Sequence, residues 1–172
     1  FFKKTLDLDG WNQEKYISCI DIANYYKTID IEKSIYYNSL AHFYDNTRVE
    51  CILELVYFYE NDFCDNNTIK LKLLTSIPYY KVADPLSSNY LFINGIAHNV
   101  YFFNYVVKTA YKLNEFKIYC NYLNEQLKRI ENIPKEYQDN IFSNIDLCFR
   151  EFNCKELFDI YSTLNYIFYK SN

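Results

Sequence analysis

Glycine and proline are scarce in this sequence: 2 Gly and 3 Pro occur in 172 residues. An all-β domain needs these residues at its many tight turns, so their scarcity argues against sandwiches and barrels. Long helices need few of either. We therefore predict an all-α fold in a single domain, residues 1–172, because a chain of this length can bury a core of its own.

Long apolar runs and positive charge are also lacking. No stretch of about 18 apolar residues occurs, so we predict no membrane span. The formal net charge is −4, which opposes contact with phosphate backbones, so we predict no nucleic-acid partner. The same charge disfavours RNA binding through tyrosine stacking. Methionine is absent, which predicts a fragment or a processed product.

The common enzyme motifs are missing as well. The sequence has no Gly-rich phosphate loop, no G-x-S-x-G and no H-E-x-x-H. His42 and His98 each follow an alanine, and no carboxylate or cysteine cluster stands at ligand spacing from either. We predict that both are partly exposed and serve packing or capping. The expectation is a non-enzyme without catalytic residues, cofactor or metal.

The 6 cysteines form no C-x-x-C pair. Cys19, Cys51 and Cys120 lie among apolar neighbours, as buried thiols do in a reducing compartment, so we predict a cytoplasmic protein. An even count also fits a secreted or exported protein with disulfides. Only Cys148 and Cys154 are close enough in sequence to suggest a specific pair, and whether the cysteines are paired stays open.

Aromatic residues are abundant, with 20 Tyr and 14 Phe. Together with the many Asn, Ile and Lys residues, they indicate an AT-rich genome such as that of a parasite or a large DNA virus. Many aromatics stand in tandem, so one ring can fill a helix interface while its neighbour points about 100° away. Tyrosine is a favoured binding anchor. The predicted partner-binding residues are Tyr26, Tyr37, Tyr59, Tyr80 and Tyr101.

Helix starts are marked by capping residues. Asp30 is a predicted N-cap, and Thr47 with Glu50 forms a predicted capping box. A further helix is predicted to start at about Asn67 and to be kinked or shortened by Pro78. These signals, with the apolar periodicity, predict about 8 or 9 helices.

The spacing of the helix starts predicts a two-helix repeat. Starts near Asn12, Asn46 and Pro85 lie 34 and 39 residues apart. Small residues such as Ala23 and Ala41 occupy positions where two helices of a hairpin approach closely. The predicted parts of the domain are three hairpins and a C-terminal set of helices or cap: 11–45, 46–83, 84–116 and 117–172.

The stretch ANYYKTIDIEKSIYYNSLAHF resembles the core of a Sel1-like repeat, a relative of the tetratricopeptide repeat. ADPLSSNYLF resembles the junction between two such repeats, and the resemblance covers about residues 12–115. It implies an α-solenoid that holds other proteins together without chemistry of its own. The residues that carry it are Ala23, Tyr25, Tyr26, Asp30, Lys33, Tyr36, Tyr37 and Ala41.

We therefore predict a right-handed α-solenoid of antiparallel hairpins, acting as a non-catalytic scaffold that binds a peptide or helix of a protein partner. The alternative is a structural subunit or surface component of a larger assembly, with a closed helical fold and no groove. The sequence leaves open the partner, the oligomeric state and the role of the last 40 or so residues.

Overall fold

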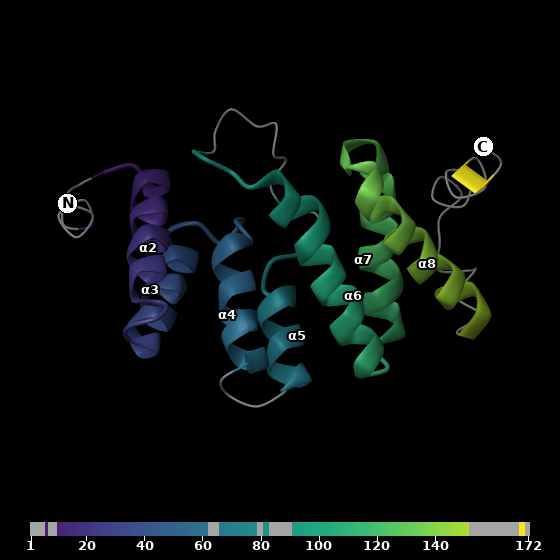
Figure 1. Cartoon of the computed structure of the whole chain (residues 1–172), viewed down its shortest axis with the longest axis horizontal. Coiled ribbons are helices and arrows are strands. Elements are labelled where there is room, and N and C mark those ends of the chain that lie inside the picture. The colour runs from purple at the N-terminus through teal and green to yellow at the C-terminus, as the bar shows by residue number, and fades with distance from the viewer. Residues whose placement is uncertain are drawn as a thin grey trace. The chain divides into compact units, whose positions relative to one another are not determined.

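The computed structural model describes residues 6, 10–61, 66–78, 81–82, 91–151 and 169–170. Helices and the loops between them make up these residues, with no strand among them (Figure 1). The predicted all-α class is confirmed. The contacts divide the chain into two compact units, residues 1–98 and 99–172, and each unit is described by itself.

The first unit contains α2 (Asn12–Tyr26), α3 (Ile31–Tyr44), α4 (Glu50–Asn61) and α5 (Asn67–Thr75). Each of these helices packs against the next one along the chain. The core between them is aliphatic and aromatic. Its fully buried side chains include Tyr16, Ala41, Val49, Ile52, Val56, Phe58, Leu74 and Ile77.

The second unit begins within a π-helical turn, Ala97–Tyr101, which continues directly into α6 (Phe102–Lys112). Helix α7 (Phe116–Lys128), a 3-10 turn (Ile130–Asn132) and α8 (Lys135–Glu151) complete the described part. Helix α7 packs against both α6 and α8. The limits of the three hairpins predicted from the sequence stay a prediction.

Two predicted helix starts are confirmed. The Asp30 side chain caps α3 by accepting a hydrogen bond, 3.1 Å long, from the amide of Lys33. Helix α5 begins at Asn67, and the preceding Asn66 caps it. This helix also ends before Pro78, as expected from a residue that lacks an amide donor.

The predicted capping box is wrong. Helix α4 begins at Glu50 itself, whereas a capping box places its glutamate in the third helical position. The Thr47 hydroxyl instead donates to the Asp45 carboxylate over 2.6 Å. The amide of Cys51, in the first turn of α4, donates to the Tyr16 hydroxyl at 3.3 Å. A residue from α2 therefore satisfies this amide.

A small residue of α2, Ala23, lies at the contact between α2 and α3. The Ser34 hydroxyl of α3 donates to the carbonyl oxygen of Ala23 in α2 over 2.9 Å, which brings the two backbones close together. Ala23 and Ala41 are both buried. A larger side chain at either position has no space to occupy.

Replacing Ala41 with tryptophan is expected to lower the free energy of unfolding by about 1–3 kcal/mol or more, because it overfills a close-packed site. Tyr36→Trp, at an exposed position on the same helix, is the matched control and should unfold like the wild type. Urea denaturation followed by circular dichroism measures both. Equal midpoints for the two variants would contradict the close packing at Ala41.

No helix in the described ranges has both the length and the apolar character that crossing a bilayer takes.

Candidate functional site

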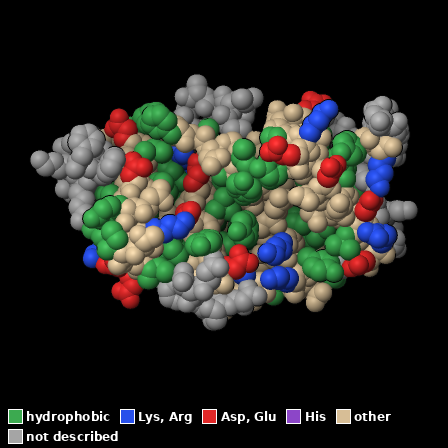
Figure 2. Space-filling model, viewed as in Figure 1, with side chains coloured by type: hydrophobic (Ala, Val, Ile, Leu, Met, Phe, Trp, Pro, Cys, Tyr) green, Lys and Arg blue, Asp and Glu red, His purple; other side chains and the backbone are tan. Residues whose placement is uncertain are grey.

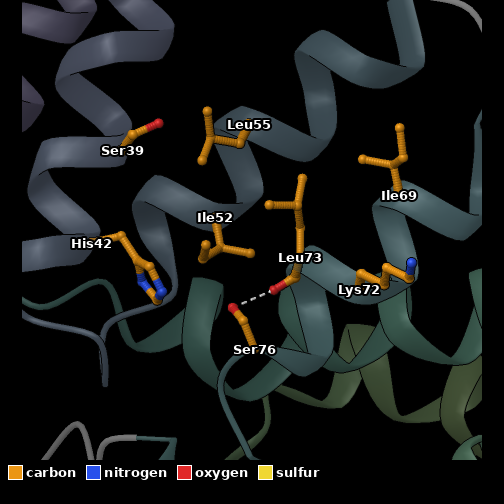
Figure 3. Close-up of a pocket in the computed structure, with 8 residues that line it drawn as sticks. All are labelled: Ser39, His42, Ile52, Leu55, Ile69, Lys72, Leu73 and Ser76. Carbon is orange, nitrogen blue, oxygen red and sulfur yellow. Dashed lines mark hydrogen bonds between the residues drawn. The ribbon is translucent and has the colours of Figure 1, made fainter.

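A pocket of about 320 Å³ opens between α3, α4 and α5 of the first unit (Figure 3). Four of the residues that line it are aliphatic: Ile52 and Leu55 from α4, and Ile69 and Leu73 from α5. Figure 3 shows Ile52 and Leu73 near its centre. The remaining lining residues carry polar groups, and they are Ser39, His42, Lys72 and Ser76.

The pocket has a buried apolar floor and a solvent-exposed polar rim. Ile52 and Leu55 are buried and belong to the core as well as to the pocket. Ser39, Lys72 and Ser76 are exposed. This division, apolar inside with a few polar groups at the edge, is typical of binding pockets.

His42 is the half-buried titratable side chain in the pocket wall. Burial lowers the pKa of its imidazole, and the opposing charge of Asp45 only partly offsets this effect. The ring is therefore neutral at neutral pH. Its Nδ1 atom is buried, and no hydrogen-bond partner for it exists among the described residues. The pocket thus contains one neutral imidazole with an unused nitrogen.

The two serines of the pocket are engaged with their own helices. The Ser39 hydroxyl donates to the carbonyl oxygen of Ile35 over 2.9 Å. The Ser76 hydroxyl donates to that of Leu73 over 2.6 Å, the contact drawn in Figure 3. Within the described part of the chain, no hydrogen bond joins either serine to His42. What the arrangement offers is an apolar surface with polar edges, which suits the burial of an apolar group.

A buried ionic network lies at the start of α4. Arg48, only 1% exposed, pairs with the Glu50 carboxylate at 2.8 Å. Its guanidinium also donates to Gln13 Oε1 at 3.0 Å and lies 4.2 Å from the centre of the Tyr16 ring. Gln13 in turn donates to the Asp45 carboxylate. The network therefore joins α2 to the loop before α4.

The same carboxylate binds His98. The Nε2 atom of His98 lies 3.2 Å from Glu50 Oε2, and the Tyr16 hydroxyl donates to that oxygen at 3.1 Å. His98 is 0% exposed, so the predicted partly exposed histidine is wrong for this residue. Burial raises the pKa of Glu50, but the hydrogen bonds from His98 and Arg48 outweigh burial and hold it well below the usual range.

The network also fixes the residues just before the π-helical turn. Arg48 donates to the carbonyl oxygens of Leu91, at 2.8 Å, and Phe92, at 3.4 Å, and the amide of Asn94 donates to Glu50 at 3.2 Å. Phe92 has a φ of 48°, in the left-handed region that costs a bulky residue about 1–2 kcal/mol. Its side chain is 83% exposed. Buried charges thus hold a strained, exposed phenylalanine in place.

Sequence reasoning missed this network. The sequence pattern predicts a capping box at Glu50 and a partly exposed His98, and it contains no local motif at Arg48. The available signal was one of only three arginines in the chain, two residues before a glutamate in the stretch NTRVE. Three or more His, Cys, Asp or Glu side chains do not gather at metal-ligand spacing anywhere in the described ranges.

The structure brings two of the predicted tyrosines together. The rings of Tyr26 and Tyr37 stack with centroids 6.1 Å apart and 4° between their planes. Tyr25 and Tyr36 lie edge-on against them. The outer pair is the more exposed, Tyr25 at 67% and Tyr36 at 59%. Lys33 lies over the Tyr26 ring at 5.2 Å.

The other predicted tyrosines are separate from this cluster. Tyr59 is half-buried on α4. Tyr101 belongs to the second unit, where its hydroxyl lies 3.4 Å from that of Tyr137. Tyr80 lies outside the described residues. A role in partner binding stays a prediction for all five tyrosines.

Comparison with protein-family models, curated proteins and solved structures gives no match to this chain. The resemblance to Sel1-like repeats therefore stays a prediction from the residues quoted above.

Glu50→Gln is expected to lower the free energy of unfolding by about 3 kcal/mol at neutral pH, because it leaves the buried Arg48 without a counter-charge. It should also flatten the acid limb of the stability curve. The folded protein keeps Glu50 ionised where the unfolded chain, with a pKa near 4.5, takes up a proton. The stability that Glu50 contributes is therefore present above about pH 4.5 and is lost as the pH falls below it.

Urea unfolding from neutral to acidic pH measures this effect. Glu54→Gln is the control, since the Lys27–Glu54 pair is about one-third exposed and should contribute little. An acid limb as steep in Glu50→Gln as in the wild type would show that other carboxylates cause it.

Proposed function

We propose that this chain is a non-catalytic protein-binding module that takes an apolar side chain of a partner peptide or helix into the pocket between α3, α4 and α5. The observation that carries the proposal is the pocket itself, about 320 Å³ in volume and walled by Ile52, Leu55, Ile69 and Leu73. Burying one bulky side chain there is worth about 1.5–3 kcal/mol, the scale of a binding hot spot.

The charge at the pocket rim favours a partner with an acidic residue next to the apolar side chain that enters the pocket, called the anchor below. Lys72 is exposed at the pocket edge, and no ion pair for it is found among the described residues. An aspartate or glutamate next to the anchoring side chain would pair with it. The preferred ligand is thus a segment with one leucine, isoleucine or phenylalanine and an adjacent acidic residue.

Exposed aromatics support a role in protein binding. Tyr25 and Tyr36 point outward from the α2–α3 hairpin beside the predicted anchors Tyr26 and Tyr37. Phe92 is exposed on a backbone fixed by Arg48. Large rings held in place lose little entropy on binding.

The finer architecture belongs to the same proposal. Successive helices of each unit pack against their neighbours along the chain, as expected of hairpins that stack in a right-handed solenoid of the Sel1-like type. A reducing compartment suits the buried thiols of Cys19 and Cys51, so we place the protein in the cytoplasm.

A second candidate is a structural subunit of a larger assembly. It is favoured by the apolar side chains that reach the surface of α2, α3 and the loops beside them, in part visible in Figure 2. Exposed apolar side chains that form a contiguous patch mark sites of protein–protein contact. The exposed members are Trp11, Tyr25, Ile29, Tyr36 and Phe43.

Ser39→Trp tests the pocket. Ser39 is exposed at the rim, so an indole there should fill the cavity without disturbing the core. Ser143→Trp in α8 is a matched control, because Ser143 is also exposed and its hydroxyl likewise bonds the carbonyl oxygen four residues earlier. Peptides selected from a random phage library are measured against wild type and both variants by fluorescence anisotropy.

We expect the selected peptides to share a bulky apolar residue with an acidic neighbour. Their affinity should fall by about tenfold or more for Ser39→Trp, the loss of one buried anchor, and stay unchanged for Ser143→Trp. Peptides that bind all three proteins with equal affinity would exclude the pocket as the peptide-binding site. A library without binders, combined with self-association in sedimentation velocity, would favour the structural subunit.

A further inference from the structure

Two cysteines meet in the second unit. Cys120 on α7 and Cys148 on α8 have their sulfur atoms 3.3 Å apart. Both side chains are fully buried. The residues are 28 positions apart in sequence, so their contact is created by the packing of α7 against α8.

The geometry is close to that of a bond. A disulfide has its sulfurs about 2.05 Å apart, so two sulfur atoms 3.3 Å apart need to approach by only about 1.25 Å to bond. We propose that Cys120 and Cys148 form a disulfide cross-link between α7 and α8 when the protein meets a peroxide.

The chemistry balances with hydrogen peroxide as the oxidant. One cysteine, as its thiolate, attacks a peroxide oxygen, which breaks the O–O bond, releases hydroxide and leaves a sulfenic acid. The sulfur of the other cysteine then attacks the sulfenic sulfur, forms the S–S bond and expels the oxygen as a second hydroxide. With the two thiol protons, the products are one disulfide and two waters. Sulfur is oxidised and peroxide is reduced.

Access to the buried sulfurs is easiest from α8. Cys148 lies in the last turn of that helix, which ends at Glu151. Helix ends open locally more readily than helix centres, and peroxide is small. Once Cys148 is oxidised, its partner is already in contact, so disulfide formation competes well against further oxidation.

The cysteines of the first unit differ. Cys19 and Cys51 are as fully buried as Cys120 and Cys148, and burial raises the pKa of both thiols to about 12. Neither has a sulfur contact with another cysteine in the described ranges. The pair suggested by sequence proximity, Cys148 with Cys154, competes for the same sulfur, and Cys154 lies outside the described residues.

The cross-link has a measurable consequence for stability. It closes a long loop in the unfolded chain and so removes conformational freedom mainly from that state. The oxidised protein should melt higher than the reduced protein, by about 10 °C or more for a unit of this size. Dithiothreitol should reverse the shift.

The test is peptide mapping of the full chain. The protein is treated with hydrogen peroxide and the reaction is quenched with acid. The protein is then unfolded in the presence of an alkylating reagent, which blocks the remaining thiols, and is cleaved with trypsin. Cleavage after lysine and arginine places the three relevant cysteines in separate peptides, residues 118–128, 136–150 and 151–155. Mass spectrometry then identifies which two are joined.

We expect peptide 118–128 joined to 136–150, with the peptides of Cys19 and Cys51 alkylated. A disulfide between 136–150 and 151–155 would overturn the proposal. Recovery of every cysteine in alkylated form, with no disulfide, would overturn it as well. Cys154→Ser is the control variant and should give the same link and the same rise in melting temperature. Cys120→Ser should abolish both, with its fold checked by circular dichroism before oxidation.

Discussion

The pairing of Arg48 with Glu50 is the interaction on which the first unit depends. Both groups pay a desolvation penalty of several kcal/mol, which the geometry must offset through Coulomb attraction and hydrogen bonds. The carboxylate achieves this by accepting from Arg48, Tyr16, His98 and the amide of Asn94. These partners come from α2, from the loop before α4 and from the residues around the π-helical turn, so one carboxylate sets the positions of three segments.

Local features of the fold were predictable from the sequence. The caps at Asp30 and Asn66 each involve an amide three residues further on, so composition and spacing within one turn determine them. The scarcity of Gly and Pro settled the fold class for a similar reason, since turn chemistry is local. The role of Glu50 was not predictable in this way, because its partners Tyr16 and His98 lie 34 and 48 residues away. A local capping motif and a long-range ion pair compete for the same residue types.

The candidate pocket was unpredictable for another reason. Its wall draws on three helices, and Ile52 and Leu55 occur in an apolar stretch that reads as core. Only the packing of the helices shows that a cavity remains between α3, α4 and α5. The tyrosine pairs were predictable in part. Helix geometry predicts that one ring of each pair is packed and its neighbour is exposed, but how exposed each ring is can be seen only in the structure.

Tyr16 places an unusual limit on how this chain can drift in evolution. The chain has 20 Tyr and 14 Phe, and the codons of the two amino acids differ by a single base, so exchanges between them arise often by mutation. At a position where only the ring packs, such an exchange is nearly silent. At position 16 the hydroxyl both donates to Glu50 and accepts from the first-turn amide of α4. One nucleotide change would leave a buried carboxylate and a helix end each short of a partner. Selection should therefore retain tyrosine at position 16, while Tyr and Phe can replace one another at positions where only the ring packs.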